Sequence, residues 1–131
     1  MTERPTVFPC LKYRDAPAAI EWLGRAFGFE RQLVVPGSGD TVGHAQLRSG
    51  AGMVMCSSET VPDPANPWSA VPFGVYVRVD DVDAHHARAV AAGAEVAMGP
   101  RDTGYGARDY SVRDLEGRLW CFGDYDPCAE A

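Results

Sequence analysis

The chain aligns with itself without a gap when it is shifted by about half its length, and this internal repeat constrains the fold more than any other feature. The identical residues fall at expected helix caps, turns and late strands. The identical pairs are Phe8/Phe73, Asp15/Asp80, Ala19/Ala84, Ala26/Ala91, Gly28/Gly93, Glu30/Glu95, Gly39/Gly104, Arg48/Arg113, Gly52/Gly117, Cys56/Cys121 and Pro62/Pro127. Because the residues that begin and end helices and form turns are the ones that repeat, the chain is expected to fold as two copies of one unit.

The first half reads as a strand, a helix and three strands. Residues 7–13 predict a strand, and Asp15 is placed to cap a helix over residues 16–27 that Gly28 ends. Ile20, Leu23 and Phe27 lie three and four residues apart, on one face of that helix. The three strands are expected at residues 29–35, 41–48 and 53–57.

The second half repeats this order after a proline-rich linker over residues 59–72. Its strand at 73–79 alternates, and either Asp80 or Asp81 caps a helix that runs to Ala92 and is closed by Gly93. The remaining segments are a strand at 94–98, a glycine-rich loop at 99–106, and strands at 108–113 and 118–125.

The unit is therefore βαβββ, used twice within a single domain over residues 1–131. The modules span about residues 5–58 and 73–126. One half alone is too small to bury a secure core. We therefore expect an α+β fold in which the two modules form a cup-shaped mixed sheet with the helices outside.

Composition narrows the class of partner. The chain has 12 Lys and Arg against 18 Asp and Glu, a formal charge of −6, and a pI of about 4.9. This balance argues against nucleic acid as a partner. No apolar run is long enough to cross a bilayer, and the N-terminus has no signal-peptide core, so a membrane is not expected either. The four cysteines form no C-x-x-C pair and are expected to be reduced thiols in the cytoplasm.

The paired modules, the helices ending in Phe-Gly-Phe and Ala-Gly-Ala, and the stretch from Gly106 to Trp120 resemble the vicinal oxygen chelate superfamily. That superfamily includes glyoxalase I, extradiol dioxygenases and bleomycin resistance proteins. The likeness covers residues 7–125 and is strongest to glyoxalase-like and bleomycin-resistance-like members. It also implies a homodimer, which the exposed edges of the expected sheet support.

The resemblance further implies a divalent metal held by His, Glu or Gln from four inner strands. The corresponding positions here are Phe8, Gly74, Cys121 and either Met55 or Cys56. None of these residue types is a ligand of that set, so neither a metal nor another cofactor is expected.

The cysteine thiols and histidine imidazoles are the other residues that could bind a metal or take part in catalysis. Cys10, Cys56 and Cys121 would suit a soft metal if ionised, although the simpler interpretation is three small apolar residues in strand interiors. His85 and His86 are expected to be solvated or interfacial. His44 lies mid-strand, facing either the cup or solvent, and is a weak candidate for acid–base catalysis because no nearby carboxylate orients it.

The expected inner wall is apolar with a few polar groups, which suits a flat organic ligand. Trp68 and Tyr105 are placed to close over that ligand, although Trp68 would equally serve to contact a partner subunit. Arg108 would meet an anionic group or a neighbouring Asp, and Trp120 and Phe122 are expected to face the helices. The residues predicted to bind the ligand are Phe8, Cys10, His44, Met55, Cys56, Trp68, Tyr76, Arg78, Tyr105, Arg108 and Cys121.

The function predicted from these residues is metal-free binding and sequestration of a small molecule, as in bleomycin resistance proteins. The alternative is a metal-dependent lyase, isomerase or dioxygenase of the glyoxalase type, with ligands such as His44 or Glu59. A metal-free enzyme that uses His44 or a thiol is a third hypothesis.

Overall fold

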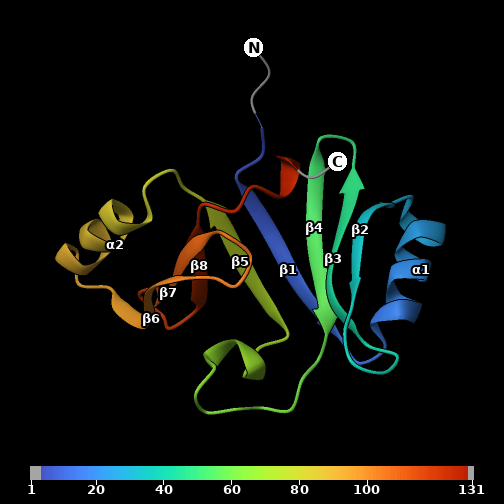
Figure 1. Cartoon of the computed structure of the whole chain (residues 1–131), viewed down its shortest axis with the longest axis horizontal. Coiled ribbons are helices and arrows are strands. Elements are labelled where there is room, and N and C mark those ends of the chain that lie inside the picture. The colour runs from blue at the N-terminus through green and yellow to red at the C-terminus, as the bar shows by residue number, and fades with distance from the viewer. Residues whose placement is uncertain (1–3, 130–131) are drawn as a thin grey trace.

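A computed structural model describes residues 4–129, and it confirms two βαβββ modules in an α+β fold (Figure 1). None of the helices in residues 4–129 is long and apolar enough to span a membrane. The elements are β1 (Val7–Tyr13), α1 (Ala16–Phe27), β2 (Glu30–Pro36), β3 (Val42–Ser49), β4 (Gly52–Ser58), the 3₁₀ helix η1 (Pro67–Ala70), β5 (Phe73–Arg78), α2 (Val82–Ala91), β6 (Glu95–Asp102), β7 (Arg108–Arg113), β8 (Leu119–Gly123) and the 3₁₀ helix η2 (Pro127–Ala129).

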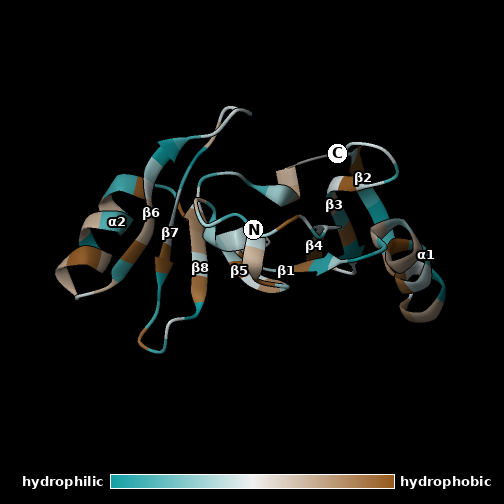
Figure 2. Cartoon of the chain, turned by 90° about the horizontal axis from the view of Figure 1, so that it is seen from below, coloured by the Kyte–Doolittle hydropathy of each residue, from teal (hydrophilic) through white to brown (hydrophobic). Residues whose placement is uncertain are grey.

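The strands form one mixed sheet in the order β2-β3-β4-β1-β5-β8-β7-β6. β1 pairs antiparallel with β5 at the centre, so the sheet runs unbroken from one module into the other. Within each module the first strand pairs parallel with the last, β1 with β4 and β5 with β8. In the view of Figure 2 the sheet arches, and α1 and α2 lie at its two outer ends. The cup with external helices is therefore confirmed.

Each helix begins at an aspartate cap, as the sequence predicts. The side chain of Asp15 accepts a hydrogen bond from the backbone N–H of Ala18 at 3.1 Å, and Gly28 ends α1 with φ of 78°. Of the two possible caps for α2, Asp81 is the one used, accepting from the Ala84 N–H at 3.0 Å. Asp81, not Asp80, is therefore the counterpart of Asp15.

Two boundaries in the second module, the ends of β6 and β8, differ from expectation by more than one residue. β6 continues to Asp102, which pairs with Arg108, so the expected glycine-rich loop at 99–106 shrinks to residues 103–107. Gly99 does not break the strand, because the β6–β7 register shifts between Met98 and Arg101 and accommodates it. β8 ends at Gly123, earlier than expected, and the chain then crosses the cup.

The space between α1 and the sheet is filled mainly by aliphatic side chains. Its fully buried members include Ala16, Ala45 and Leu47, and Cys56 belongs to the same cluster. Because alternate residues of a strand face opposite sides, Met55 faces the cup. This settles the choice between Met55 and Cys56 for the fourth inner position.

The expected equivalence of Cys56 and Cys121 is therefore wrong. Cys10 pairs with Met55 across β1 and β4, and Tyr76 pairs with Cys121 across β5 and β8. All four lie on the inner face, in one apolar cluster, so the counterpart of Cys121 is Met55. The gap-free alignment is out of register by one residue here, as it is at the helix caps.

The core beneath α2 is aromatic. Tyr110 is fully buried there, and Trp120 and Phe122 pack beside it, which confirms that these two face the helix. His85 was expected to be solvated or interfacial but instead joins this cluster. Its Nδ1 lies 2.6 Å from the Tyr110 hydroxyl, and its ring stacks on Phe122 with centroids 4.0 Å apart.

Candidate ligand-binding site

A cavity of about 660 Å³ lies on the inner face of the sheet, and both modules line it. Its volume falls within the range of sites for drug-sized organic ligands, on the order of 300–1,000 Å³. The lining residues are Cys10, Leu33, Val35, Gly43, His44, Met55, Trp68, Tyr76, Arg101, Tyr105, Asp109, Ser111, Cys121 and Tyr125.

The wall from module one is mostly apolar, and its one imidazole, that of His44, is hydrogen-bonded to the side-chain amide of Gln46. His44 Nε2 lies 2.8 Å from Oε1 of Gln46, which is fully buried. The Gln46 Nε2 donates to the Pro127 carbonyl at 3.3 Å, and this contact fixes which end of the amide is oxygen. His44 Nε2 therefore carries the proton that it donates to Gln46.

The wall from module two carries the charged groups. Asp109 lies on β7 and its side chain is only 11% exposed, whereas Arg101 on β6 is 54% exposed. Arg101 Nε lies 3.2 Å from Asp109 Oδ1. Burial raises the pKa of the Asp109 carboxyl above its ordinary value, because Arg101 offsets only part of the cost of removing the charge from water.

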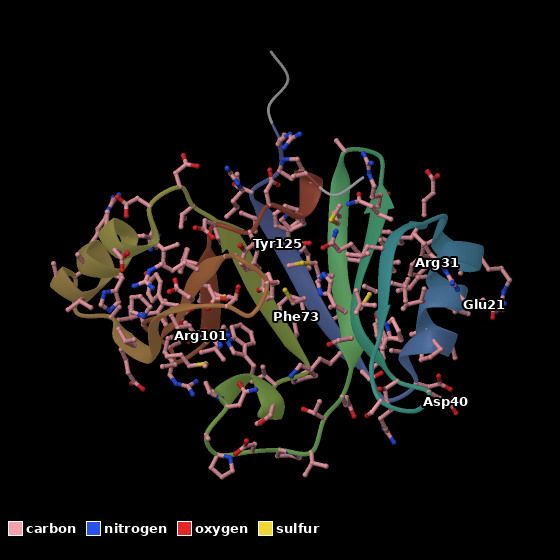
Figure 3. The ribbon with its side chains drawn as sticks, in the orientation of Figure 1. Glu21, Arg31, Asp40, Phe73, Arg101 and Tyr125 are labelled. Carbon is pink, nitrogen blue, oxygen red and sulfur yellow. The ribbon has the colours of Figure 1, made fainter. Side chains whose placement is uncertain are left out.

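Residues 124–129, here called the C-terminal strap, close one side of the cup. The Tyr76 hydroxyl donates to the Tyr125 carbonyl at 2.7 Å, and the Tyr125 hydroxyl donates to Gln46 Oε1. Asp126 forms an ion pair with Arg4 at 2.8 Å. Figure 3 shows Tyr125 near the centre of the molecule, where the strap passes between the modules. The strap thus connects the end of module two to the inner strands of module one.

Trp68 enters the cavity from the linker. Asn66 caps η1, and the Trp68 indole N–H donates to Ser111 Oγ at 2.8 Å. The Lys12 ammonium group donates to the Trp68 carbonyl and holds this turn against β1. A Cβ added at Gly74 would lie 2.0 Å from Trp68 Cζ3. Glycine at position 74 is therefore what allows the indole to lie on the sheet.

The four positions where the resemblance implies metal ligands are Phe8, Gly74, Met55 and Cys121, and these residues do not fit such a metal. Phe8 and Gly74 have no donor atom in their side chains, and the Met55 thioether is a poor ligand for the hard and borderline cations. Burial raises the pKa of Cys121 to about 12, so its thiol is protonated at neutral pH. The Trp68 ring also occupies the space above Gly74.

The other proposed ligands do not assemble either. Within residues 4–129 no three His, Cys, Asp or Glu side chains lie together as a metal site would require. His44 contacts Gln46, and Glu59 is exposed. Burial raises the pKa of Cys10 to about 12 and that of Cys56 to about 11, which disfavours the thiolates that a soft metal needs.

Most of the predicted ligand-binding residues line the cavity, and the others lie outside its wall. Cys10, His44, Met55, Trp68, Tyr76, Tyr105 and Cys121 line it. Whether these residues bind a ligand stays a prediction.

The expectation of a place in the cavity wall is wrong for the others. Phe8 is fully buried beneath the inner surface. Cys56 faces α1 and lines only a smaller cavity of about 120 Å³. Arg78 turns to Asp80 and Asp126, with N–O distances of 3.3 and 3.7 Å.

Arg108 also lies outside the cavity, because alternation along β7 places it on the opposite face from Asp109. It forms ion pairs with Asp83 at 2.9 Å and with Asp102 at 3.1 Å. Of its two expected roles, pairing with a neighbouring aspartate is the one confirmed.

Several lining residues were missed by the sequence interpretation. These are Leu33, Val35, Gly43, Arg101, Asp109, Ser111 and Tyr125. A signal for two of them was present, since the shift that reveals the repeat aligns Asp109 with His44 and Ser111 with Gln46. If His44 lies on the inner face of module one, its aligned residue Asp109 is expected on the inner face of module two.

Comparison with known proteins identifies the family. The sequence profile of the Glyoxalase/Bleomycin resistance protein/Dioxygenase superfamily matches residues 9–122. The chain therefore belongs to this superfamily. An uncharacterised protein of Mycobacterium bovis is 32% identical in an alignment 126 positions long that covers 91% of this chain and 82% of that protein.

Solved structures agree on the fold. Methylmalonyl-CoA epimerase from Mycobacterium tuberculosis superposes with a TM-score of 0.69 at 16% identity, covering 98% of this chain and 95% of that one. At this identity the likeness shows the fold alone. TioX from Micromonospora sp. ML1 is 39% identical over 87% of this chain and 90% of that one, with a TM-score of 0.37, too low to compare the two sites.

Proposed function

We propose that this protein binds a flat aromatic small molecule between its two modules and sequesters it without a metal. One observation carries the proposal. Where the family resemblance implies a metal, the inner face carries Phe8, Gly74, Met55 and Cys121, and the Trp68 ring lies over Gly74 beside a cavity of about 660 Å³. A large cavity with an aromatic and sulfur-rich wall favours binding through stacking and buried area.

The aromatic side chains supply the binding surface. Trp68, Tyr76, Tyr105 and Tyr125 all line the cavity, and they come from the linker, β5, the loop after β6 and the C-terminal strap. Tyr105 and Tyr125 meet edge to face with centroids 5.6 Å apart. Rings held on separate elements can contact both faces of a planar ligand, and each such contact adds to the free energy of area burial.

Metal content is the first part of the test. Untagged protein purified without chelators is analysed by plasma mass spectrometry after dialysis. The proposal expects no transition metal at a stoichiometric amount. A bound metal that survives dialysis would contradict it and favour the glyoxalase-type enzyme.

Ligand binding is the second part. A panel of tricyclic aromatic dyes is titrated into the protein while tryptophan fluorescence is followed. We expect quenching that is lost in W68F and kept in W22F, because Trp22 lies on α1 with Phe27 and outside the cavity. Quenching that W68F leaves unchanged would place the dye elsewhere.

A further inference from the structure

Four hydrogen-bond donors of the cavity wall are committed to acceptors within the protein. The Trp68 indole N–H is donated to Ser111, and the Tyr76 hydroxyl to the Tyr125 carbonyl. The Tyr125 hydroxyl and the His44 Nε2–H are both donated to Gln46 Oε1. A ligand acceptor could reach one of these four donors only by breaking its present contact, at the cost of leaving a buried group unsatisfied.

The principal acceptor in the wall is the Asp109 carboxylate. Among the described residues that line the cavity, Asp109 and Arg101 are the only carboxylate and guanidinium. The Asp109 side chain is almost nine-tenths buried, and an ionised carboxylate accepts hydrogen bonds only. His44 Nδ1 is a further acceptor, because Nε2 carries the proton in the neutral ring.

Arg101 is a weak partner for this carboxylate. Its Nε approaches Asp109 Oδ1 at 3.2 Å, but more than half of its side chain is in solvent, and it lies on the edge strand β6. Figure 3 shows Arg101 on the module-two side of the cup. The raised pKa of Asp109 agrees with incomplete compensation of its charge, and the nearby Asp124 carboxylate adds to the rise.

We propose that the cavity selects planar aromatic ligands that carry a cationic amino or amidinium-type N–H group, and that this group binds the Asp109 carboxylate in place of Arg101. The inference rests on the proposed function and adds the ligand's chemical class to it. The aromatic rings supply the buried area, and Asp109 supplies the polarity that discriminates between ligands of the same shape.

Three tricyclic probes of matched shape test the charge preference. At pH 7.5 the probe 9-aminoacridine is a cation, acridine is neutral and acridine-9-carboxylate is an anion. Their affinities for the wild-type protein are measured by isothermal titration calorimetry. We expect 9-aminoacridine to bind at least about tenfold more tightly than acridine, the size expected of a charge-assisted hydrogen bond, and the carboxylate to bind most weakly.

Variants assign the preference to the residue. D109N keeps the shape of the side chain and should bring the affinities for 9-aminoacridine and acridine close together. R101Q removes the competing cation and should raise the affinity for 9-aminoacridine several-fold without changing that for acridine. D40N is the matched control, because Asp40 is exposed in the turn between β2 and β3 and lies outside the lining, and it should retain the wild-type ratio.

The outcomes separate the two proposals. If the wild-type protein binds acridine and 9-aminoacridine equally, or if D109N and D40N change the ratio alike, the inference fails while the proposed function stands. If none of the three probes binds, the proposed function fails, and the inference fails with it. R101Q keeps the test decisive if D109N does not fold, since an unchanged affinity for 9-aminoacridine in R101Q would also overturn the inference.

Discussion

The two modules share one order of elements but fill the space under their helices differently. α1 buries Ala16, Ile20 and Leu23 against aliphatic residues of the sheet. α2 buries only Val82, and the aromatic side chains of β7 and β8 fill the space beneath it. The comparison teaches that the βαβββ pattern fixes the path of the backbone and leaves the composition of each core free.

The inner faces differ more, and this difference determines the chemistry. At matching positions of β3 and β7, module one carries His44 and Gln46, whereas module two carries Asp109 and Ser111. Gln46 is satisfied within the protein, while Asp109 is left with one exposed arginine. Module one thus supplies most of the apolar wall, and module two supplies the group that can recognise a charged ligand.

A third contrast concerns the first strand of each module. Phe8 and Gly74 each lie seven residues before the aspartate that caps the following helix. Module one fills the inner face with its own phenyl ring, and module two fills it with Trp68 from the linker. The predictions below test these contrasts, from the largest expected effect to the smallest.

Phe8→Ala should cost about 3–5 kcal/mol of unfolding free energy, because Phe8 is fully buried on the strand that joins the modules. Urea unfolding followed by far-UV circular dichroism and by fluorescence should show one coincident transition. Val7→Ala, at a position 55% exposed, is the control and should change the free energy by less than about 0.5 kcal/mol. Two separate transitions would show that the modules unfold independently.

Leu23→Ala on α1 should cost about 2–5 kcal/mol, because Leu23 is buried against the sheet. Val90→Ala on α2 should change stability by less than about 0.5 kcal/mol, because half of the Val90 side chain remains in solvent. The two variants are compared by thermal and urea unfolding. Similar costs on both helices would contradict the unequal burial of α1 and α2.

Gly74→Ala should cost about 1–3 kcal/mol and displace the Trp68 ring, because the new methyl group would overlap Cζ3. In the double variant G74A/W68A the methyl group should cost much less, which a double-mutant cycle measures as a coupling energy. Gly99→Ala is the matched control, since an added Cβ there meets nothing within 4 Å. Additive effects of G74A and W68A would show that the indole does not lie over Gly74.

His85→Gln should make stability less sensitive to acid. Burial against Tyr110 and Phe122 beneath α2 lowers the pKa of His85 below its ordinary value of 6.5, and the charge of Arg88 lowers it further. The folded state then binds fewer protons than the unfolded chain, so stability is greatest above pH 6.5 and falls as the pH drops through the folded-state pKa. Thermal unfolding from pH 7.5 to 5 should show a shallower decline in H85Q than in wild type. H86Q controls for removal of one imidazole from the same helix.

The sequence was sufficient to predict elements with strong local signals. The bounds of β1, α1 and β7 agree with expectation, because a cap, a glycine stop or a clear alternation marks each end. The end of β6 was missed, because its pairing with β7 continues past Gly99. Strand ends depend on such partners, and a single segment does not reveal them.

The candidate site was predictable on the inner strands and unpredictable at its edges. Alternation placed Cys10, Tyr76 and Cys121 correctly, since each lies on a well-defined strand. The gap-free repeat gave the wrong face for Cys56, because the true counterparts Met55 and Cys121, like the caps Asp15 and Asp81, lie one residue further apart than that alignment assumes. Tyr125 had no local signal at all, because its place depends on contacts of the C-terminal strap with Tyr76 and Gln46.

The most direct test of the account is to locate a bound aromatic cation by nuclear magnetic resonance. The protein has three tryptophans, and each gives its own indole N–H signal, assignable with single Trp→Phe variants. Trp68 lines the cavity, Trp22 lies on the outer helix α1, and the Trp120 indole donates to Asp114 at 3.1 Å. On titration with 9-aminoacridine, the account predicts that the Trp68 signal shifts while the Trp22 and Trp120 signals stay in place. A shift of Trp22 or Trp120 with Trp68 unmoved would contradict it.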